Sequence, residues 1–484
     1  MMGPIQSREA KLFHYGISLE KRIRMNNPLR AIKRIVDFSF VRPRVADFYG
    51  SDGHESEDPI VIVKLMMLLY MDDVASEREL MRRIPERLDY LWFLEFDLED
   101  EIPNHSVLSK ARALWGGEVY EELFVRSVRQ CVEAGLVDGD KIHMDGSLVD
   151  ANASKESIRS GPAALIEALR QVHRREVSKL EPDEGTGEDD NGGRTVTRPA
   201  GATATMSTTD PDAAVVRKAT DSARPRYKHH RVVDEQCGVI TAVETTAGDI
   251  MENEKLIALV EQHESNTGEP VRTVVADAQY GTNENFAACQ QREIRSHMKD
   301  LRSTYRNDAA KRGIFKESDF QYDPIAETYL CPAGQRLKRS ERIDRGFHIF
   351  RSDPQLCQAC SLRTQCMKSK RNVRTLKRHV QHEAIELARA ESHSGWARRD
   401  RRRRQHLMEG SFADAANNHG FKRSRWRRLK NQRIQDWLIA TCQNLRILIG
   451  HERRRAAAAM VVGIAKLEKS NAAVFSPGSA FKTL

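Results

Sequence analysis

Two short, β-prone runs in this 484-residue chain each end in an aspartate that a small residue follows. Residues 141–144 lead to Asp145, and residues 273–276 lead to Asp277. A carboxylate in this position is expected at the C-terminal end of a strand, and open α/β sheets bind ligands outside those ends. Two carboxylates brought together there repel each other, and a divalent cation between them relieves the repulsion. The pattern therefore predicts a metal-dependent site.

The elements between the two aspartates suit a mixed sheet. Residues 227–233 and 238–245 are predicted to form a β-hairpin, and residues 251–263 an amphipathic helix that leads into the later strand. A helix that crosses between parallel strands does so with a right-handed connection. If the first strand lies between the hairpin and the later strand, Asp145 and Asp277 are neighbours. This arrangement is an RNase H-like α/β fold, a mixed sheet flanked by helices.

Positive charge is concentrated in the last fifth of the chain. Lysine and arginine total 78 against 69 aspartate and glutamate, which gives a net charge of +9. Six of the seven residues in 398–404 are arginine, and a second basic run spans 422–430. A solvated helix face or a disordered tract is the plainer interpretation of either run alone. Because such clusters neutralise phosphates and release counterions, nucleic acid is the predicted partner. The residues expected to contact it are Arg401, Arg402, Arg403, Arg404, Lys422, Arg423, Arg425, Arg427 and Arg428.

No uninterrupted apolar run reaches membrane-spanning length, and the N-terminus lacks the apolar core of a signal peptide. We therefore expect a cytoplasmic protein. In that reducing compartment its eight cysteines are expected to be free thiols or metal ligands rather than disulfides.

Four of the cysteines lie within one short segment. Cys357 and Cys360 have the C-x-x-C spacing of a zinc knuckle, and Cys331 and Cys366 would complete a tetrahedral set. A zinc ion with four thiolates has a closed coordination shell, so this would be a structural site. Four ordinary reduced cysteines are the alternative, because Cys331 is distant in sequence and the last pair is C-x₅-C. The other four, Cys131, Cys237, Cys289 and Cys442, are predicted to be small buried hydrophobes.

Several segments, taken in order, resemble the bacterial insertion-sequence DDE transposases. The resemblance runs from about residue 25 to residue 450, and it rests on the motifs together rather than on any single one. The similar segments are residues 145–154 (first catalytic motif), 207–213 and 227–230 (between the first two motifs), 275–281 (second motif), 409–415 with the following His419-Gly420 (third motif) and 443–446 (C-terminal helix).

The resemblance implies that Asp145, Asp277 and Glu409 hold two Mg²⁺ or Mn²⁺ ions. Two such cations activate a water and neutralise the leaving 3′-oxygen when a phosphodiester is cut. The resemblance further implies that the freed 3′-hydroxyl attacks target DNA in the same site. The implied partners are double-stranded DNA, as terminal inverted repeats and target, and further copies of the chain in a homodimer or larger assembly.

Each carboxylate has a plainer interpretation. Asp145 and Asp277 could be turn or cap residues, and Glu409 could form a surface ion pair on a basic helix. Relatives often carry Tyr, Arg and Lys at fixed offsets from this glutamate, whereas Gln405 and Ala416 stand nearby here. The rivals of Glu409 for the third position are Asp414, Glu391 and Glu383.

At this length two or three domains are expected. The predicted divisions are an all-α N-terminal DNA-binding region (1–135), the first part of the catalytic domain (136–325, with a flexible insertion at 181–213), a small cysteine-containing insertion (326–370), catalytic-domain helices with basic runs (371–450) and a tail (451–484). Two other functions fit the same features: a catalytically inactive, transposase-derived DNA-binding protein, and a metal-dependent nuclease that cuts without joining. The intact carboxylate set favours the transposase over a purely binding protein.

Overall fold

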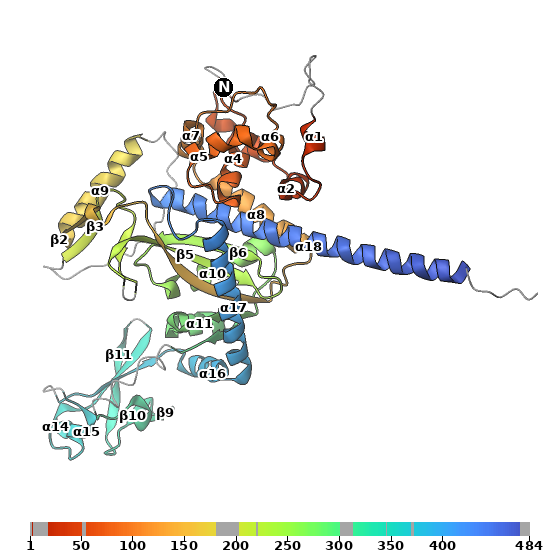
Figure 1. The fold of residues 1–484 in the computed structure, drawn as a ribbon. Coiled ribbons are helices and arrows are strands. Elements are labelled where there is room, and N and C mark those ends of the chain that lie inside the picture. The colour runs from red at the N-terminus through yellow and green to blue at the C-terminus, as the bar shows by residue number, and fades with distance from the viewer. Residues whose placement is uncertain are drawn as a thin grey trace, which may run out of the picture.

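The computed structural model describes residues 2, 18–50, 55–180, 203–218, 221–300, 313–344, 346–368 and 372–474. Helices near the N-terminus form one body, a mixed sheet with flanking helices forms the centre, and a second sheet lies at the far end (Figure 1). The long helix α18 (Leu429–Val474) runs between the N-terminal helices and the central sheet. In the part of the chain described, no helix has the length and apolar character needed to cross a membrane.

The N-terminal body is built around α4 (Pro59–Met71), a helix that is apolar on nearly every side and almost entirely buried. Asp58 begins this helix by accepting a hydrogen bond from the Ile60 amide (3.1 Å), as the acidic stretch before it predicts. The one lysine in α4, Lys64, is also buried and pairs with Glu95 at 3.1 Å. The surrounding elements are α1 (Leu19–Arg22), α2 (Pro28–Ile35), α3 (Val41–Val45), η1 (Ala46–Phe48), α5 (Glu77–Arg83), η2 (Ile84–Glu86), α6 (Leu88–Leu94), α7 (Ser106–Trp115) and α8 (Glu118–Glu133).

The central sheet has six strands in the order β4-β5-β1-β7-β8, with β6 also paired to β5. Its first strand runs antiparallel to β5 and parallel to β7. It therefore lies between the β5–β6 hairpin and β7, which confirms the predicted RNase H-like mixed sheet. The strands are β1 (Lys141–Asp150), β4 (Ala214–Val216), β5 (Arg224–Asp234), β6 (Ile240–Ala247), β7 (Thr273–Ala276) and β8 (Arg295–Met298).

The two faces of this sheet pack against different helices. Alternate residues of β1, such as Ile142 and Met144, join a core with α10 (Leu256–Thr267), α11 (Asn283–Gln291) and α16 (His382–Ser392). The opposite face, with Val233 and Val243, packs against Met408 of α17 (Gly395–Asn418) and against α8 and α18.

One strand boundary differs from the sequence prediction. Asp145 was expected to end the first strand, but β1 continues to Asp150. The antiparallel partner β5 explains the difference, because its residues remain paired with β1 from Ile142 to Asp150. Pairing with β7, in contrast, covers only residues 141–143 of β1. Asp145 therefore lies where β1 has passed the end of its parallel neighbour.

The predicted flexible insertion is only partly described. Residues 181–202 lie outside the described residues. At its C-terminal end the segment instead forms β3 (Thr203–Ser207), which pairs with β2 (Ile158–Pro162) beside α9 (Ala163–Leu180). A short helix, η3 (Lys155–Ser157), precedes β2.

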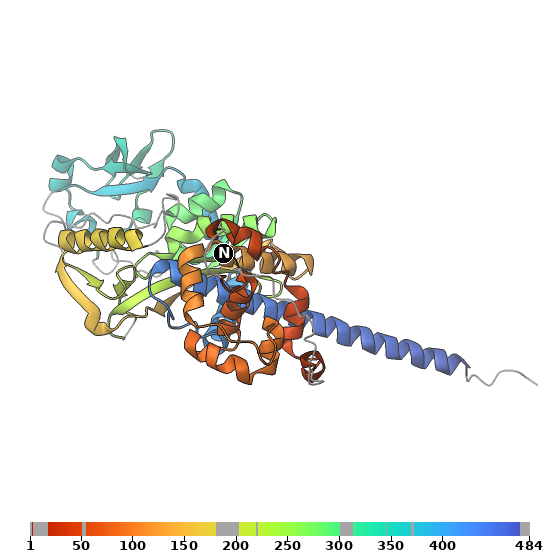
Figure 2. The ribbon, with the colours of Figure 1, turned by 90° about the horizontal axis from the view of Figure 1, so that it is seen from above.

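A separate five-stranded antiparallel sheet contains the cysteine-rich segment (Figures 1 and 2). The sheet extends beyond the predicted insertion 326–370 on both sides, since it begins at Gln321 and ends at His379. Its elements are η6 (Glu317–Asp319), β9 (Gln321–Asp323), β10 (Thr328–Leu330), β11 (Arg336–Asp344), β12 (Phe347–Arg351), α14 (Pro354–Gln358), α15 (Arg363–Cys366) and β13 (Thr375–His379). At the other end of the chain, α18 crosses the predicted tail boundary at residue 451 without a break.

Candidate metal centre and basic surface

The two predicted aspartates meet beside the end of β7. Asp277 is the first residue after β7, and its side chain accepts a hydrogen bond from the Gln279 amide (2.8 Å) at the start of η5 (Ala278–Tyr280). Asp145 extends from β1 toward the face of the sheet that α17 covers, where it meets Arg404 at 2.8 Å. The sequence prediction that these two carboxylates are neighbours agrees with this placement.

A third carboxylate, Glu252, completes the group. It begins η4 (Glu252–Lys255), the short helix that leads from β6 into α10. One carboxylate oxygen from each of Asp145, Glu252 and Asp277 lies within 4.8 Å of the other two, and this is the one such acidic or metal-ligating group among the described residues. Sequence reasoning assigned Glu252 to the predicted amphipathic helix and missed its role in the group.

A glycine explains how Glu252 comes so close to β1. A Cβ atom on Gly146 would lie 2.8 Å from the Glu252 carboxyl carbon, a separation that real Cβ atoms do not adopt. A glycine inside a strand often marks such a close approach. Gly146, directly after Asp145, is therefore the signal in the sequence that could have indicated a third carboxylate.

The three carboxylates have an unfavourable environment for negative charge. Burial, together with the charges of Asp277 and Asp145 and against the opposing charge of Lys228, raises the pKa of Glu252 to about 7. Burial also raises the pKa of Asp145, against the opposing influence of Arg404. The Tyr280 hydroxyl is buried near the same carboxylates, and it has no hydrogen-bond partner in the described part of the chain.

These features suit a hard divalent cation. Mg²⁺ and Mn²⁺ prefer carboxylate oxygens, and Mg²⁺ retains several waters. A cation here would offset the repulsion among the carboxylates, and one of its waters could hydrogen-bond to the orphaned Tyr280 hydroxyl. The donor set therefore fits the metal that the sequence predicts.

The predicted third ligand, Glu409, lies outside this group. It is exposed on α17, and its Oε1 accepts a hydrogen bond from Gln405 Nε2 at 3.0 Å. It follows Arg404 by five residues, which places it about 140° further round the helix. Arg404 faces Asp145, so Glu409 points away from the carboxylates.

The three residues that the sequence offers as alternatives to Glu409 also interact with side chains outside the carboxylate group. Glu391 lies 3.8 Å from His297, and Asp414 pairs with Arg446 at 3.1 Å. Glu383 pairs with Arg378.

The first basic run, on α17, combines structural and exposed arginines. Arg404 pairs with Asp145, and Arg401 donates to the Ser392 carbonyl at 2.7 Å. Arg402 and Arg403 are exposed, with Arg403 3.4 Å from Glu235. The α17 run therefore presents only part of its charge to solvent.

The second basic run lies in the connection between α17 and α18. Arg425 is held by the N-terminal body, because it pairs with Asp73 at 2.6 Å and lies over the Tyr70 ring. The other members remain close to the catalytic sheet or to solvent. Lys422 donates to Ser147 Oγ at 3.0 Å, Arg427 donates to the Asn152 carbonyl at 3.4 Å, the Arg428 amide donates to Asp210 at 3.2 Å, and Arg423 is exposed.

The four clustered cysteines occupy a different place. Cys331, Cys357, Cys360 and Cys366 all line one cavity in the outlying sheet domain. Cys131, Cys289 and Cys442 are buried as predicted, whereas Cys237 is exposed at the β5–β6 turn. Its exposure corrects the prediction of a buried hydrophobe, since a hairpin turn leaves it no core to join.

Comparisons with known families match two separate parts of the chain. A family described as a transposase domain (DUF772) matches residues 17–114, and a family described as a transposase DDE domain matches residues 330–449. The second range contains the cysteine cluster and Glu409, whereas Asp145, Glu252 and Asp277 lie between the two ranges. No curated protein matches the chain.

Among solved structures, a piggyBac transposase synaptic complex with hairpin DNA is similar to 88% of this chain and 75% of that chain, at 8% identity and a TM-score of 0.37. A likeness this weak supports no further inference. The family matches lie on both sides of an RNase H-like sheet in sequence, and they are consistent with the resemblance of the catalytic motifs. Over residues 17–114 and 330–449 the chain is therefore similar to transposase domains, which is consistent with a DDE transposase of the insertion-sequence type.

Proposed function

We propose that this protein cuts DNA at the terminal inverted repeats of its own element and joins the freed ends to target DNA in a metal-dependent reaction. The observation that carries the proposal is the convergence of Asp145, Glu252 and Asp277 within 4.8 Å. When bound, Mg²⁺ or Mn²⁺ ions would supply an activated water and neutralise the charge on the leaving 3′-oxygen. The chain itself supplies the fixed carboxylates and a surrounding positive charge.

Each residue has a separate part in this proposal. Asp145 and Asp277 hold the metal, and Glu252 is the third ligand already in place. Arg404 balances the charge of Asp145 before the metal arrives. Glu409, the third residue that the family resemblance implies, is the alternative third ligand.

The DNA partner is supported by charge that the fold leaves exposed. Arg402, Arg403 and Arg423 are exposed, and Lys422 donates to Ser147 Oγ, two residues after Asp145 on β1. We assign Arg425 to holding the N-terminal body against the α17–α18 connection, because its guanidinium is committed to Asp73 and to the Val74 carbonyl. Joining two DNA ends also calls for two active sites, so we propose a homodimer or larger assembly on DNA.

The test is an in vitro strand-transfer assay with Mg²⁺ and DNA that carries the element's ends. Asp277→Asn should abolish cleavage and joining, and Glu252→Gln should reduce both strongly. Glu261→Gln, an exposed glutamate on α10 that pairs with Arg292, is the matched control and should leave them unchanged.

The same assay separates the alternatives. Cleavage without joining by the unaltered protein would indicate a nuclease, and binding without cleavage would indicate an inactive DNA-binding relative. If Glu409→Gln abolishes activity and Glu252→Gln does not, the third ligand is Glu409 and the assignment of Glu252 is wrong.

A further inference from the structure

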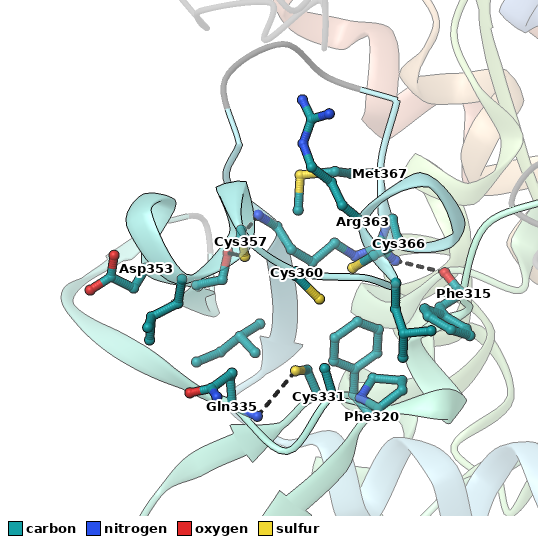
Figure 3. Close-up of a pocket in the computed structure, with 17 residues that line it drawn as sticks. Phe315, Phe320, Cys331, Gln335, Asp353, Cys357, Cys360, Arg363, Cys366 and Met367 are labelled. Atoms are coloured by element: carbon teal, nitrogen blue, oxygen red, sulfur yellow. Dashed lines mark hydrogen bonds between the residues drawn. The ribbon is translucent and has the colours of Figure 1, made fainter.

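The outlying sheet domain brings four cysteines from two separate arms to one cavity (Figure 3). Cys331 lies on the turn between β10 and β11. Cys357 and Cys360 lie in and just after α14, and Cys366 ends α15. The cavity between the arms has a volume of about 30 Å³, which exceeds the roughly 10–15 Å³ that a cavity needs to hold one water molecule. It therefore has room for a single ion.

The first arm, the β10–β11 turn, directs a backbone amide at the sulfur of Cys331. The Gln335 amide donates to Cys331 Sγ at 3.3 Å, and the Gly334 amide donates to the Cys331 carbonyl at 2.8 Å. Gly334 has φ +78°, a conformation that suits glycine and closes the turn tightly. A backbone amide aimed at a sulfur stabilises the thiolate over the thiol, as metal ligation requires.

In the second arm, the α14–α15 segment, local hydrogen bonds fix the positions of the cysteine sulfurs. Asp353 caps α14 by accepting from the Gln355 amide at 2.8 Å, and the Cys360 amide donates to the Cys357 carbonyl. The Cys357 thiol donates to Ser352 Oγ at 3.1 Å. This arm therefore presents its cysteines from one short, hydrogen-bonded segment.

Charges around the cavity suit a thiolate site. Four thiolates that line one cavity repel one another, and a cation bound between them relieves the repulsion. Four thiolates around Zn²⁺ carry a net charge of −2. Arg363 and Arg374 line the same cavity, and Arg374 is fixed by donating to the Cys366 and Phe315 carbonyls at 2.9 Å each.

The size of the domain supplies a reason for a metal. Among the described residues its buried hydrophobic cluster consists of Phe320, Tyr329, Leu337, Phe350 and Leu376, with four partly buried side chains packed against it. Cores this small rarely hold a domain together, and natural small domains often add a structural metal.

We propose that Cys331, Cys357, Cys360 and Cys366 bind one structural Zn²⁺ that clamps the β10–β11 turn to the α14–α15 segment. Binding releases the thiol protons that remain on the four sulfurs. In the described residues only the Asp145 group already has its ligand atoms within 4.8 Å of one another. The two cysteine arms therefore move closer together when zinc binds. This site is separate from the carboxylate group and does not depend on the proposed reaction.

The test measures metal content in the full chain, purified under reducing conditions from zinc-supplemented cells. Elemental analysis should give one zinc per chain for the natural protein. The double variant Cys357→Ser/Cys360→Ser should contain less than a tenth of that amount. Cys237→Ser, a change at an exposed cysteine outside the cluster, should retain it fully.

Two further measurements keep the proposal open to refutation if the double variant folds poorly. Cys366→His should retain zinc, because three cysteines and one histidine also make a structural zinc site. Cobalt substituted into the natural protein should give the thiolate-to-metal charge-transfer absorption of a tetrahedral sulfur site, and this absorption should persist in Asp277→Asn. Absence of zinc from the natural protein, full zinc content in the double variant, or cobalt without thiolate absorption would each overturn the proposal.

Discussion

Replacing Arg404 with glutamine should strengthen metal binding at the carboxylate group. Arg404 Nη1 lies 2.8 Å from Asp145 Oδ2, with side-chain exposures of 14% and 26%. At a separation of about 4 Å between charge centres, such a pair is worth roughly 4 kcal/mol at an effective dielectric constant near 20. Exposed pairs contribute about 1 kcal/mol or less, so this partly exposed pair is worth about 1–2 kcal/mol. The guanidinium competes with a cation for the same oxygen. Its loss should therefore lower the Kd for Mn²⁺ by roughly 5- to 30-fold.

Calorimetric titration of the DNA-free protein with Mn²⁺ measures this change directly. Arg402→Gln is the matched control, because it removes the same charge from an exposed position on the same helix. Its Kd should stay within about twofold of the natural value, since the charge is screened by solvent. A Kd for Arg404→Gln that equals the control's, or that rises, would refute the idea that Arg404 occupies a metal ligand. In the absence of metal, Arg404→Gln should also lower the thermal midpoint, because the carboxylates lose their neutralising partner.

Two further predictions concern stability. Burial raises the pKa of Asp210 to about 6, so its protonated form favours folding below about pH 4 and that contribution is lost as the pH rises to 6. Asn at position 210 can still accept the hydrogen bond from the Tyr227 hydroxyl. Between pH 4 and 7 the free energy of unfolding of Asp210→Asn should therefore rise relative to that of the natural protein by up to about 3 kcal/mol. The difference between the two thermal midpoints should widen over this range, and a difference that does not change with pH would contradict the prediction. Gly420→Ala should lower the free energy of unfolding by about 1–3 kcal/mol, because Gly420 has φ +64° and a Cβ atom there would lie 2.5 Å from Asp73 Oδ1. Gly410→Ala is the control, because a Cβ atom at Gly410 on α17 meets open space, and this change should be neutral or slightly stabilising. Equal thermal midpoints for the two variants would contradict the expected backbone strain at residue 420.

The pairing of Asp145 and Asp277 could be predicted because it depends on local patterns and a general rule. The β-prone runs, the hairpin between them and the right-handed crossover together restrict the strand order. The end of β1 could not be predicted in the same way. Asp-Gly-Ser has the composition of a turn, but β5 pairs with these residues and holds them extended.

Glu252 was missed because its position depends on contacts between distant segments. Its own neighbours suggest the first turn of an amphipathic helix, and η4 and α10 do form there. Only the packing of η4 against β1, permitted by Gly146, brings its carboxylate to Asp145. The structural use of Arg425 has the same origin, since its partner Asp73 is 352 residues away in sequence.

The prediction that both basic runs contact DNA is limited for the same reason. Sequence composition gives the number of arginines but not which ones find a carboxylate in the folded chain. Arg404 and Arg425 are taken by Asp145 and Asp73, while Arg402 remains exposed. Fold class was therefore accessible from the sequence, and the division of charge between structure and surface was not.

We propose that Asp277 binds the catalytic metal together with Asp145 and Glu252. The most direct measurement is cleavage of end-containing DNA by Asp277→Cys in Mg²⁺ and in Mn²⁺. A thiolate is a poor ligand for Mg²⁺ and a better one for Mn²⁺. We expect a loss of more than about 100-fold in Mg²⁺, since the metal supplies several kcal/mol to the transition state. In Mn²⁺ we expect a substantial recovery. Cleavage near the natural rate in Mg²⁺, or an equal loss in both metals, would contradict it.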